Sequence, residues 1–171
     1  MQVLKYLGIF LIFTISSLIG KIYSKRYASR VKDLEEMKKA LLMFKSNIRF
    51  TYESIPEVFK KISHELKQNI GNIFENASKY MESDIASKAW KISLDENKTN
   101  TNMLESDVEA LKSLSKMLGD MDLEGQINNI DLVIEMLNNQ IEEAKIEQGK
   151  NEKMYKVLGT GIGLTIAIIL I

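Results

Sequence analysis

The sequence predicts an all-α fold, an antiparallel bundle of about six helices whose first and last helices extend into transmembrane segments at the two ends of the chain. Apolar residues recur every three or four positions along most of the 171 residues, as on one face of an amphipathic helix. The chain has a single proline, and no stretch alternates apolar and polar residues over a useful strand length. At this length, one domain with short appendages is expected.

An uncharged apolar run lies at each end of the chain. Residues 6–20 read YLGIFLIFTISSLIG and residues 157–171 read VLGTGIGLTIAIILI. As a helix, each run rises roughly 22 Å, short of the roughly 30 Å of a bilayer's hydrocarbon core, so flanking residues must contribute. We expect an N-terminal transmembrane anchor over residues 1–22 and a C-terminal transmembrane segment over residues 154–171. A cleaved signal peptide at the first run and a buried core helix at the second are the alternatives.

Basic side chains flank the inner side of both expected spans. They are Lys21, Lys25, Arg26, Arg30 and Lys32 after the first run, and Lys145, Lys150, Lys153 and Lys156 before the second. Cytoplasmic flanks of membrane spans are enriched in lysine and arginine, so the middle of the chain, residues 23–153, is expected in the cytoplasm. Membrane lipid of negative charge can bind the first basic flank, although its role in setting the orientation is the simpler explanation.

In the middle of the chain, the spacing of the apolar residues predicts where each helix lies. Apolar residues within 31–48 step by three or four and predict a helix that continues the first span. A break is expected near Thr51. Ser54 and Glu57 then have the spacing of a capping box, with a proline in the first turn, and they begin a second helix.

Four further helices are expected. Apolar periodicity predicts helices over residues 70–81 and 85–94, the second capped by Ser83 or Asp84. The stretch DENKTNTN, residues 95–102, is the most polar of the chain and is predicted to be a loop. A fifth helix is expected over residues 104–118, ending at Gly119. Beyond Asp122 the spacing stays helical without a proline, so the last helix is expected to run unbroken into the second span.

Charge is balanced over the whole chain but not along it. Lysine and arginine together number 23, as do aspartate and glutamate, so nucleic acid is not an expected partner. Residues 21–49 hold nine basic and three acidic side chains, a net charge of +6. Residues 103–152 hold four basic and twelve acidic side chains, a net charge of −8. One arm of the chain is therefore basic and the other acidic.

No pattern of catalytic, cofactor-binding or metal-binding residues stands out. Residues 120–125, DMDLEG, match the start of a calcium-binding loop, but Asp131 occupies the position of the bidentate glutamate, so an aspartate-capped turn is preferred. His64, the single histidine, lies on the polar side of its helix. Trp90 lies on an apolar stripe and is expected in the core. We expect no enzyme activity, no cofactor and no metal.

Gly159 and Gly163 lie four residues apart in the second apolar run. Small residues at this spacing allow another helix to approach closely within a membrane, so both glycines are candidates for helix packing. Glycines that the bilayer merely tolerates are the alternative.

The order of these features is similar to that of a known family. A short span and a basic helix precede a capped proline turn, then Ala89-Trp90, then a stop at Leu118-Gly119 with Asp122 and Gln126 beyond it. The tail EKMYKVLG, residues 152–159, leads into the glycine-bearing apolar run. Over essentially its whole length the chain resembles the stage III sporulation protein AB family. The resemblance implies a six-helix domain like the helical domain of F-type platform proteins of type II secretion.

The resemblance also implies a cellular location and binding partners. The family acts in the mother-cell (outer forespore) membrane of endospore-forming bacteria, with its central domain in the mother-cell cytoplasm, within a secretion-like channel. The implied partners are a cytoplasmic secretion-type ATPase, stage III sporulation protein AA, and ring-forming membrane components of that channel. The residues carried over are Leu118, Gly119, Asp122 and Gln126 at the interhelical turn, and Lys153, Met154 and Tyr155 at the membrane entry. In these roles Asp122 caps, Gln126 bridges turn and helix, and the last three set the interface depth.

The function expected from these features is that of a non-catalytic platform or adaptor that couples the ATPase to the membrane ring. A membrane-anchored coiled-coil scaffold or signalling protein is the alternative, suggested by the charged stripe between Glu135 and Lys153. That protein would self-associate in parallel through its last helix. An enzyme is a third class, for which no paired catalytic groups can be named.

Overall fold

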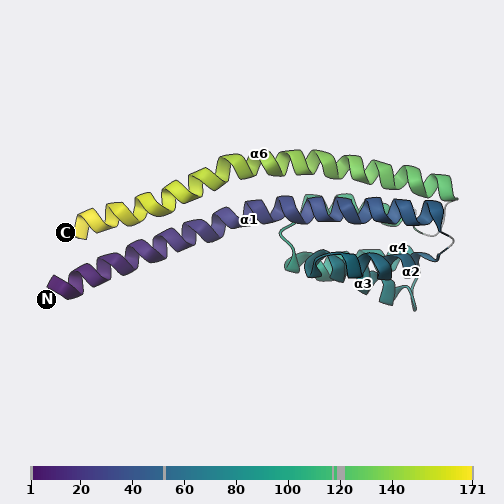
Figure 1. Cartoon of the computed structure of the whole chain (residues 1–171), viewed down its shortest axis with the longest axis horizontal. Coiled ribbons are helices and arrows are strands. Elements are labelled where there is room, and N and C mark those ends of the chain that lie inside the picture. Colours follow the sequence, from purple (N-terminus) through teal and green to yellow (C-terminus); the bar gives the residue numbers. More distant parts are fainter. Residues whose placement is uncertain (1, 52, 117, 119–121, 171) are drawn as a thin grey trace. The chain divides into compact units, whose positions relative to one another are not determined.

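The chain is built of helices. A computed structural model describes residues 2–51, 53–116, 118 and 122–170, and no strand occurs among them (Figure 1). For some helical residues, most of them near the two ends, only the backbone is described. The elements are α1 (Gln2–Phe50), α2 (Ile55–Glu65), α3 (Gln68–Tyr80), α4 (Ala86–Asn97), the 3₁₀ helix η1 (Lys98–Asn100), α5 (Glu105–Lys112), the 3₁₀ helix η2 (Ser113–Lys116) and α6 (Leu123–Leu170). The prediction of an all-α fold with about six helices is confirmed.

The helices form two compact units, which are described separately. Unit 2 comprises Lys32–Glu142 and contains the C-terminal part of α1, the N-terminal part of α6 and all of the shorter helices. Unit 1 comprises Met1–Val31 and Glu143–Ile171, the two terminal parts of the chain. The domain limits expected after residues 22 and 153 stay predictions.

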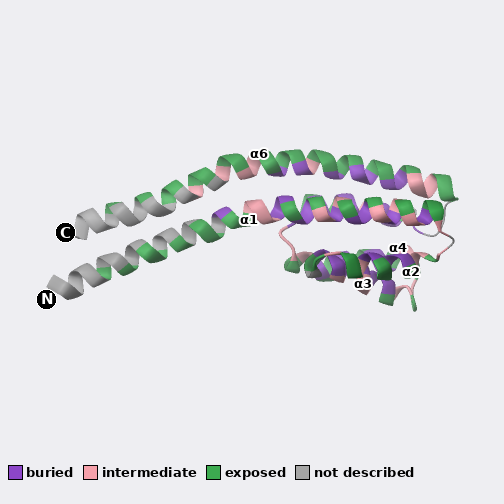
Figure 2. Ribbon diagram, in the orientation of Figure 1, coloured by how far each residue is buried: buried purple, intermediate pink, exposed green. Residues whose placement is uncertain are grey.

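The core of unit 2 is built from the apolar faces predicted for its helices. On α1 the fully buried residues include Leu34 and Leu41, and on α6 they include Val133 and Leu137 (Figure 2). Buried residues recur every three or four positions, which keeps them on one side of each helix. Because the apolar stripe of α6 is buried within its own chain as far as Ile141, it does not offer the seam that a coiled coil with another chain needs.

Four aromatic rings meet at the centre of unit 2. Phe59 of α2 lies edge-on to Phe44 and to Phe74, with ring centroids 5.0 Å apart in both pairs, and its centroid lies 5.6 Å from that of Trp90. All four side chains are fully buried, so the prediction that Trp90 belongs to the core is confirmed. The indole Nε1 of Trp90 donates a hydrogen bond to the carbonyl oxygen of Leu111 at 2.8 Å, which satisfies the polar atom of this cluster.

The helix α2 begins with the predicted capping box. Glu57 Oε2 accepts hydrogen bonds from the backbone nitrogen of Ser54 at 2.9 Å and from Ser54 Oγ at 2.8 Å. The chain then turns back closely between α2 and α3. A Cβ atom added at Gly71 would lie 2.8 Å from the carbonyl oxygen of Ser63, so only glycine fits this approach without a shift of backbone.

The capping box also makes stability depend on pH. Hydrogen bonds from the backbone and side chain of Ser54 hold the pKa of the Glu57 carboxyl below its ordinary value of 4.5. A carboxyl whose pKa is lowered by folding stabilises the fold above its unfolded pKa, and this contribution is lost as the pH falls through the folded pKa. We expect Glu57→Gln to lower the urea midpoint at about pH 7, and we expect this deficit to shrink at acidic pH as the pH falls through the lowered pKa of Glu57 and the carboxyl becomes protonated. A deficit of equal size at neutral and acidic pH would contradict this.

The polar segment 95–102 is not the loop that its composition predicts. The helix α4 continues to Asn97, and η1 follows it. Asn97 is buried, and its Nδ2 donates a hydrogen bond to the carbonyl oxygen of Ser93 at 2.9 Å. Asp95 forms an ion pair with Lys112 of α5 at 2.9 Å. The burial of Asn97 and the ion pair of Asp95 with α5 are tertiary contacts, and they outweigh the low helix propensity of aspartate and asparagine.

Two helix ends also differ from the predicted ones. The N-cap of α4 is Ile85, not Ser83 or Asp84, because the backbone nitrogens of Ser83 and Asp84 donate to the carbonyl oxygen of Tyr80 and prolong the turn after α3. The predicted fifth helix is shorter than its apolar spacing suggests. It ends as an α-helix at Lys112 and continues as η2.

The two transmembrane spans predicted at residues 1–22 and 154–171 are not supported. Helical backbone runs through both segments, but within the part of the chain whose side chains are described no helix has a stretch long and apolar enough to cross a membrane. Many side chains of both segments lie outside that part. Each uninterrupted apolar run is also shorter than the roughly 20 residues that a helical span needs.

Unit 1 joins its two helical segments through polar and aromatic contacts. Arg30 of α1 is almost fully buried, and its Nη1 donates a hydrogen bond to Glu147 Oε2 of α6 at 2.8 Å. About one turn from Arg30 on α1 and about two turns from Glu147 on α6, the rings of Tyr27 and Tyr155 stack with centroids 5.9 Å apart and planes 24° apart. The hydrogen bond with the Tyr155 side chain is the main cause that raises the pKa of Tyr27. The segments of α1 and α6 therefore contact each other in unit 1.

Candidate functional site

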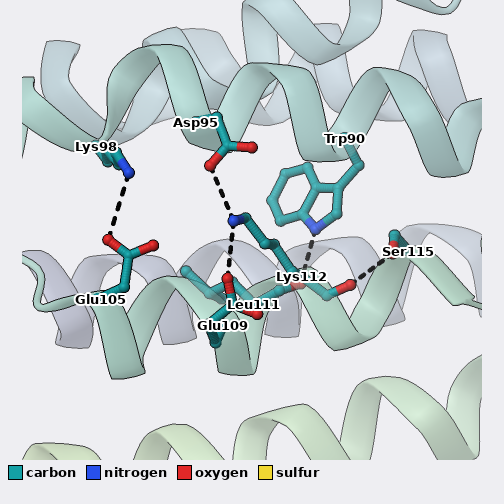
Figure 3. A network of polar contacts seen from close by, with 8 residues as sticks. All are labelled: Trp90, Asp95, Lys98, Glu105, Glu109, Leu111, Lys112 and Ser115. Atoms are coloured by element: carbon teal, nitrogen blue, oxygen red, sulfur yellow. Dashed lines mark hydrogen bonds and ion pairs between the residues drawn. The ribbon is translucent and has the colours of Figure 1, made fainter.

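A polar network ties α4 to α5 (Figure 3). Lys112 Nζ lies 2.9 Å from Asp95 Oδ1 and 2.8 Å from Glu109 Oε1. The hydrogen bond to Glu109, followed by the one to Asp95, raises the pKa of Lys112, which therefore keeps its positive charge. The buried hydrogen bond from Trp90 to the Leu111 carbonyl lies beside this ion pair. The two contacts together fix α5 on α4.

Further hydrogen bonds define the two ends of α5. Asp107 Oδ2 accepts a hydrogen bond from the backbone nitrogen of Leu104 at 2.7 Å, and the Asp107 side chain is buried. At the other end, Ser115 Oγ donates to the carbonyl oxygen of Lys112 at 2.6 Å, which satisfies a terminal carbonyl as the chain tightens into η2 (Figure 3). The chain is thereby directed from α5 toward the start of α6.

The turn before α6 brings together several of the residues expected there. Leu118 is buried and lines a small pocket together with Gln126 and residues of α1 and α6. Asp122 is exposed, and its Oδ1 accepts a hydrogen bond from the backbone nitrogen of Gly125 at 3.1 Å, as an N-cap does. Its carbonyl oxygen accepts from the backbone nitrogen of Gln126 at 3.0 Å. Gly119 lies outside the described residues.

An open groove of about 510 Å³ lies beside this turn, and we call it the turn groove. It is lined by Arg49, Asp122, Leu123, Glu124, Ile127 and Asn128. Leu123 of this lining is 50% exposed. Phe50 follows Arg49 in the chain and, although it does not line the groove, is 78% exposed. Exposed apolar side chains of this size beside polar residues are typical of protein interaction sites.

The lining of the turn groove suits recognition of a polypeptide. Leu123 and Ile127 offer apolar contact, and Arg49 on one helix and the carboxylates of Asp122 and Glu124 on the other offer both signs of charge. An apolar centre with a charged rim is the usual composition of a transient interface. Among the side chains that the structure describes, no three carboxylates or histidines gather in a way that could hold a metal ion.

The candidates at the expected membrane entry lie on α6 in unit 1. Lys153 and Met154 are exposed, and Tyr155 is half-buried against Tyr27. Gly159 and Gly163 belong to the same helix, but their surroundings lie outside the described part of the chain. The residues carried over from the family resemblance therefore belong to two different units.

The sequence-based prediction missed Arg49 of the turn groove and the exposed Phe50 that follows it in the chain. Neither residue belongs to a motif, and both lie at the end of a long helix, outside the apolar stripe on which the prediction of that helix rests. The sequence nevertheless contains one indication that Phe50 is exposed. Phe50 falls off the stripe that ends with the buried Ile48, so an aromatic side chain at this position has no place in the core.

Comparisons with known proteins agree with the fold. The family model described as Stage III sporulation protein AB (spore_III_AB) matches residues 5–171. The curated Stage III sporulation protein AB of Bacillus subtilis (strain 168) is 28% identical over 169 residues, which are 98% of this chain and 99% of that protein. A solved structure of Stage III sporulation protein AB (SpoIIIAB) superposes with a TM-score of 0.68 at 23% identity, covering 71% of this chain and 98% of the solved one. At that identity the superposition shows a shared fold.

Proposed function

This chain belongs to the stage III sporulation protein AB family, as its sequence resemblance predicts, and on that premise we propose that it is a non-catalytic platform of a secretion-like channel between mother cell and forespore. It couples a cytoplasmic secretion-type ATPase, stage III sporulation protein AA, to the ring-forming membrane components of the channel. The observation that carries this proposal is the turn groove, an exposed apolar and charged surface on a compact helical unit.

The proposal includes anchoring in the mother-cell membrane, with unit 2 in the mother-cell cytoplasm. Its support is the sequence, in which two uncharged apolar runs flank the middle and carry basic residues on their inner sides. Residues that flank each apolar run extend it toward the length that a helical membrane span needs. In this arrangement Lys153, Met154 and Tyr155 set the depth of the second segment, and Gly159 and Gly163 pack it against a neighbouring helix.

The turn groove is well placed to meet a cytoplasmic motor. It lies where α1 ends and α6 begins, whereas α1 enters and α6 leaves unit 2 at the opposite ends of these helices. The part of α1 within unit 2, residues 32–50, rises roughly 28 Å as a helix. A motor surface that presents an apolar side chain and charges of both signs matches the lining of the groove.

Flotation of lipid vesicles tests both parts of the proposal. The full chain is reconstituted in vesicles of phosphatidylethanolamine and phosphatidylglycerol and mixed with the purified ATPase. We expect the chain to stay with the vesicles after an alkaline carbonate wash, and the ATPase to float only with vesicles that carry the chain. A chain that is washed off would refute the anchoring, and an ATPase that stays behind would refute the coupling.

One substitution in the lining of the turn groove, Leu123→Ser, and one beside it, Phe50→Ser, test the role of this surface. Phe50→Ser and Leu123→Ser are each expected to weaken ATPase binding to the vesicles at least about tenfold, because apolar anchors dominate the binding energy of interfaces. Leu123 is half exposed and Phe50 is 78% exposed in the free protein, so thermal unfolding is expected to change little. The control is Ile85→Ser, which removes a side chain that is 71% exposed elsewhere on unit 2. Equal binding by all three variants would exclude the groove as the motor contact.

A further inference from the structure

In unit 1, one exposed face of α1 changes from apolar to basic along the helix. Its apolar side chains are spaced by three or four and are between 48% and 68% exposed: Leu11, Ile15, Leu18 and Ile22. Lys25 and Arg26 continue this face one turn after Ile22 and are also exposed. The face therefore has an apolar stretch of roughly 16 Å that ends in positive charge.

The exposed face of α6 in unit 1 shows the same change in the opposite chain direction. Lys150 and Lys153 are exposed and three positions apart. Val157 follows four positions after Lys153 on the same face and is 68% exposed. Met154 and Leu158 beside it are exposed large apolar side chains as well. On α6, basic side chains therefore come first and apolar ones follow.

Two contacts in unit 1 show which residues of the two helices lie at the same level. The segments are antiparallel, because Arg30 contacts Glu147, whereas Tyr27, earlier in α1, contacts Tyr155, later in α6. Counted from the ion pair, Lys153 is level with position 24 of α1. Counted from the tyrosine pair, it is level with position 29. Lys153 thus lies level with the segment 24–29 of α1.

The basic side chains of both helices therefore gather at one level of unit 1. We call this set the basic collar, and its members are Lys25, Arg26, Lys150 and Lys153. The stacked pair of Tyr27 and Tyr155 lies at the same level, since Tyr27 follows the collar on α1 and Tyr155 follows it on α6. Tyrosine is enriched where the hydrocarbon of a bilayer meets water. Aromatic and basic side chains thus mark the same boundary.

The basic collar is not neutralised within its own unit. The sequence of unit 1 contains nine basic and three acidic residues. One of the acidic residues, Glu147, is held by Arg30, which is itself buried and does not belong to the collar. Among the side chains that the structure describes, no carboxylate forms an ion pair with a collar residue. The collar therefore offers its positive charge to an external partner.

We propose that the basic collar binds the head groups of anionic phospholipids and enriches these lipids around the chain. The proposal rests on the membrane anchoring that is part of the proposed function. A lipid leaflet changes from hydrocarbon to phosphate at one level, and the exposed faces of both helices change from apolar to basic at one level. An acidic protein or a nucleic acid would pair with the collar but would leave the apolar side chains beside it uncovered.

Fluorescence quenching in lipid vesicles tests this preference. The sequence contains no cysteine, so Ile22→Cys in the full chain provides a single site for a bimane label about one turn from the collar. The labelled chain is placed in phosphatidylcholine vesicles with a small, equal fraction of brominated phosphatidylglycerol or brominated phosphatidylcholine. Brominated phosphatidylglycerol is expected to quench at least about three times as strongly. This ratio is expected to fall toward one in about 1 M salt, where the Debye length is about 3 Å.

Neutralisation of the basic collar identifies the residues responsible. Replacing all four collar residues by glutamine is expected to bring the quenching ratio close to one. The matched control replaces four exposed lysines of unit 2 by glutamine and is expected to keep the ratio: Lys39, Lys60, Lys91 and Lys116. Equal quenching by the two brominated lipids in the wild type, or an equal loss of preference in both variants, would overturn the proposal.

A carbonate wash of the same vesicles separates this proposal from the proposed anchoring. A chain that stays with the vesicles but shows no lipid preference would refute the collar and leave the anchoring intact. A chain that prefers phosphatidylglycerol but is removed by the wash would support the collar and refute the anchoring. A chain that binds neither kind of vesicle would refute both.

Discussion

Phe59→Ala is expected to lower the free energy of unfolding of the chain by roughly 3–5 kcal/mol. Phe59 is the ring that contacts the other three aromatic rings of the core, with every centroid within 5.6 Å of its own. The neighbouring rings are fully buried and held by three helices, so they cannot collapse into the space that the substitution leaves. The midpoint of thermal unfolding, followed by circular dichroism on the full chain, is expected to fall by about 10 °C or more.

Two control substitutions separate the effect of burying the ring from the effect of its aromatic character. Phe50→Ala removes a phenyl group that is 78% exposed, and its effect is expected to stay within about 0.5 kcal/mol. Phe59→Leu keeps most of the volume and is expected to cost less than about 1.5 kcal/mol. If Phe50→Ala destabilised the chain as much as Phe59→Ala does, the centre of the core would not lie at Phe59.

Gly71→Ala is expected to destabilise the fold by roughly 1–3 kcal/mol, although alanine is the better helix former. Gly71 lies near the start of α3, and the added Cβ atom would lie 2.8 Å from the carbonyl oxygen of Ser63. That oxygen belongs to the backbone of α2 and cannot move without shifting the helix. The gain in helix propensity, about 1 kcal/mol, is therefore outweighed by the strain between α2 and α3.

Gly149→Ala is the matched control for this prediction. Gly149 is also helical, but no other side chain or distant backbone atom would lie within 4 Å of the added Cβ atom. The same substitution is therefore expected to be neutral or to stabilise by up to about 1 kcal/mol. Urea unfolding of both variants measures the difference. A shift of the same sign for both would show that α2 and α3 do not approach each other at Gly71.

The helices themselves were predictable because their signals are local. The apolar spacing within 31–48 depends on one helix alone, and so does the pairing of Ser54 with Glu57 three residues later. Trp90 was predictable as core because it lies on such a stripe. Polar composition misled the prediction at residues 95–102, because the local sequence does not show that Asn97 is buried or that Asp95 pairs with Lys112 of another helix.

The candidate site was predictable only in part. Asp122 and Gln126 have positions at the start of a helix, which sequence and family resemblance both indicate. Arg49 comes from the end of a different helix and reaches the same groove only after the chain has folded. The charge asymmetry between the two arms was visible in composition, but composition does not say which charges face each other.

The sequence by itself determined most of the helical segments, which face of each helix is apolar and where the charge of each sign lies. Apolar periodicity carries this information because it describes one helix and its own burial. Only the tertiary structure decided that Gly71 touches α2, that Arg49 and Leu123 line one groove, and that Lys45 and Asp131 set the register of α1 and α6. Lys45 and Asp131 are 86 residues apart, and the packing of several helices at once brings them together.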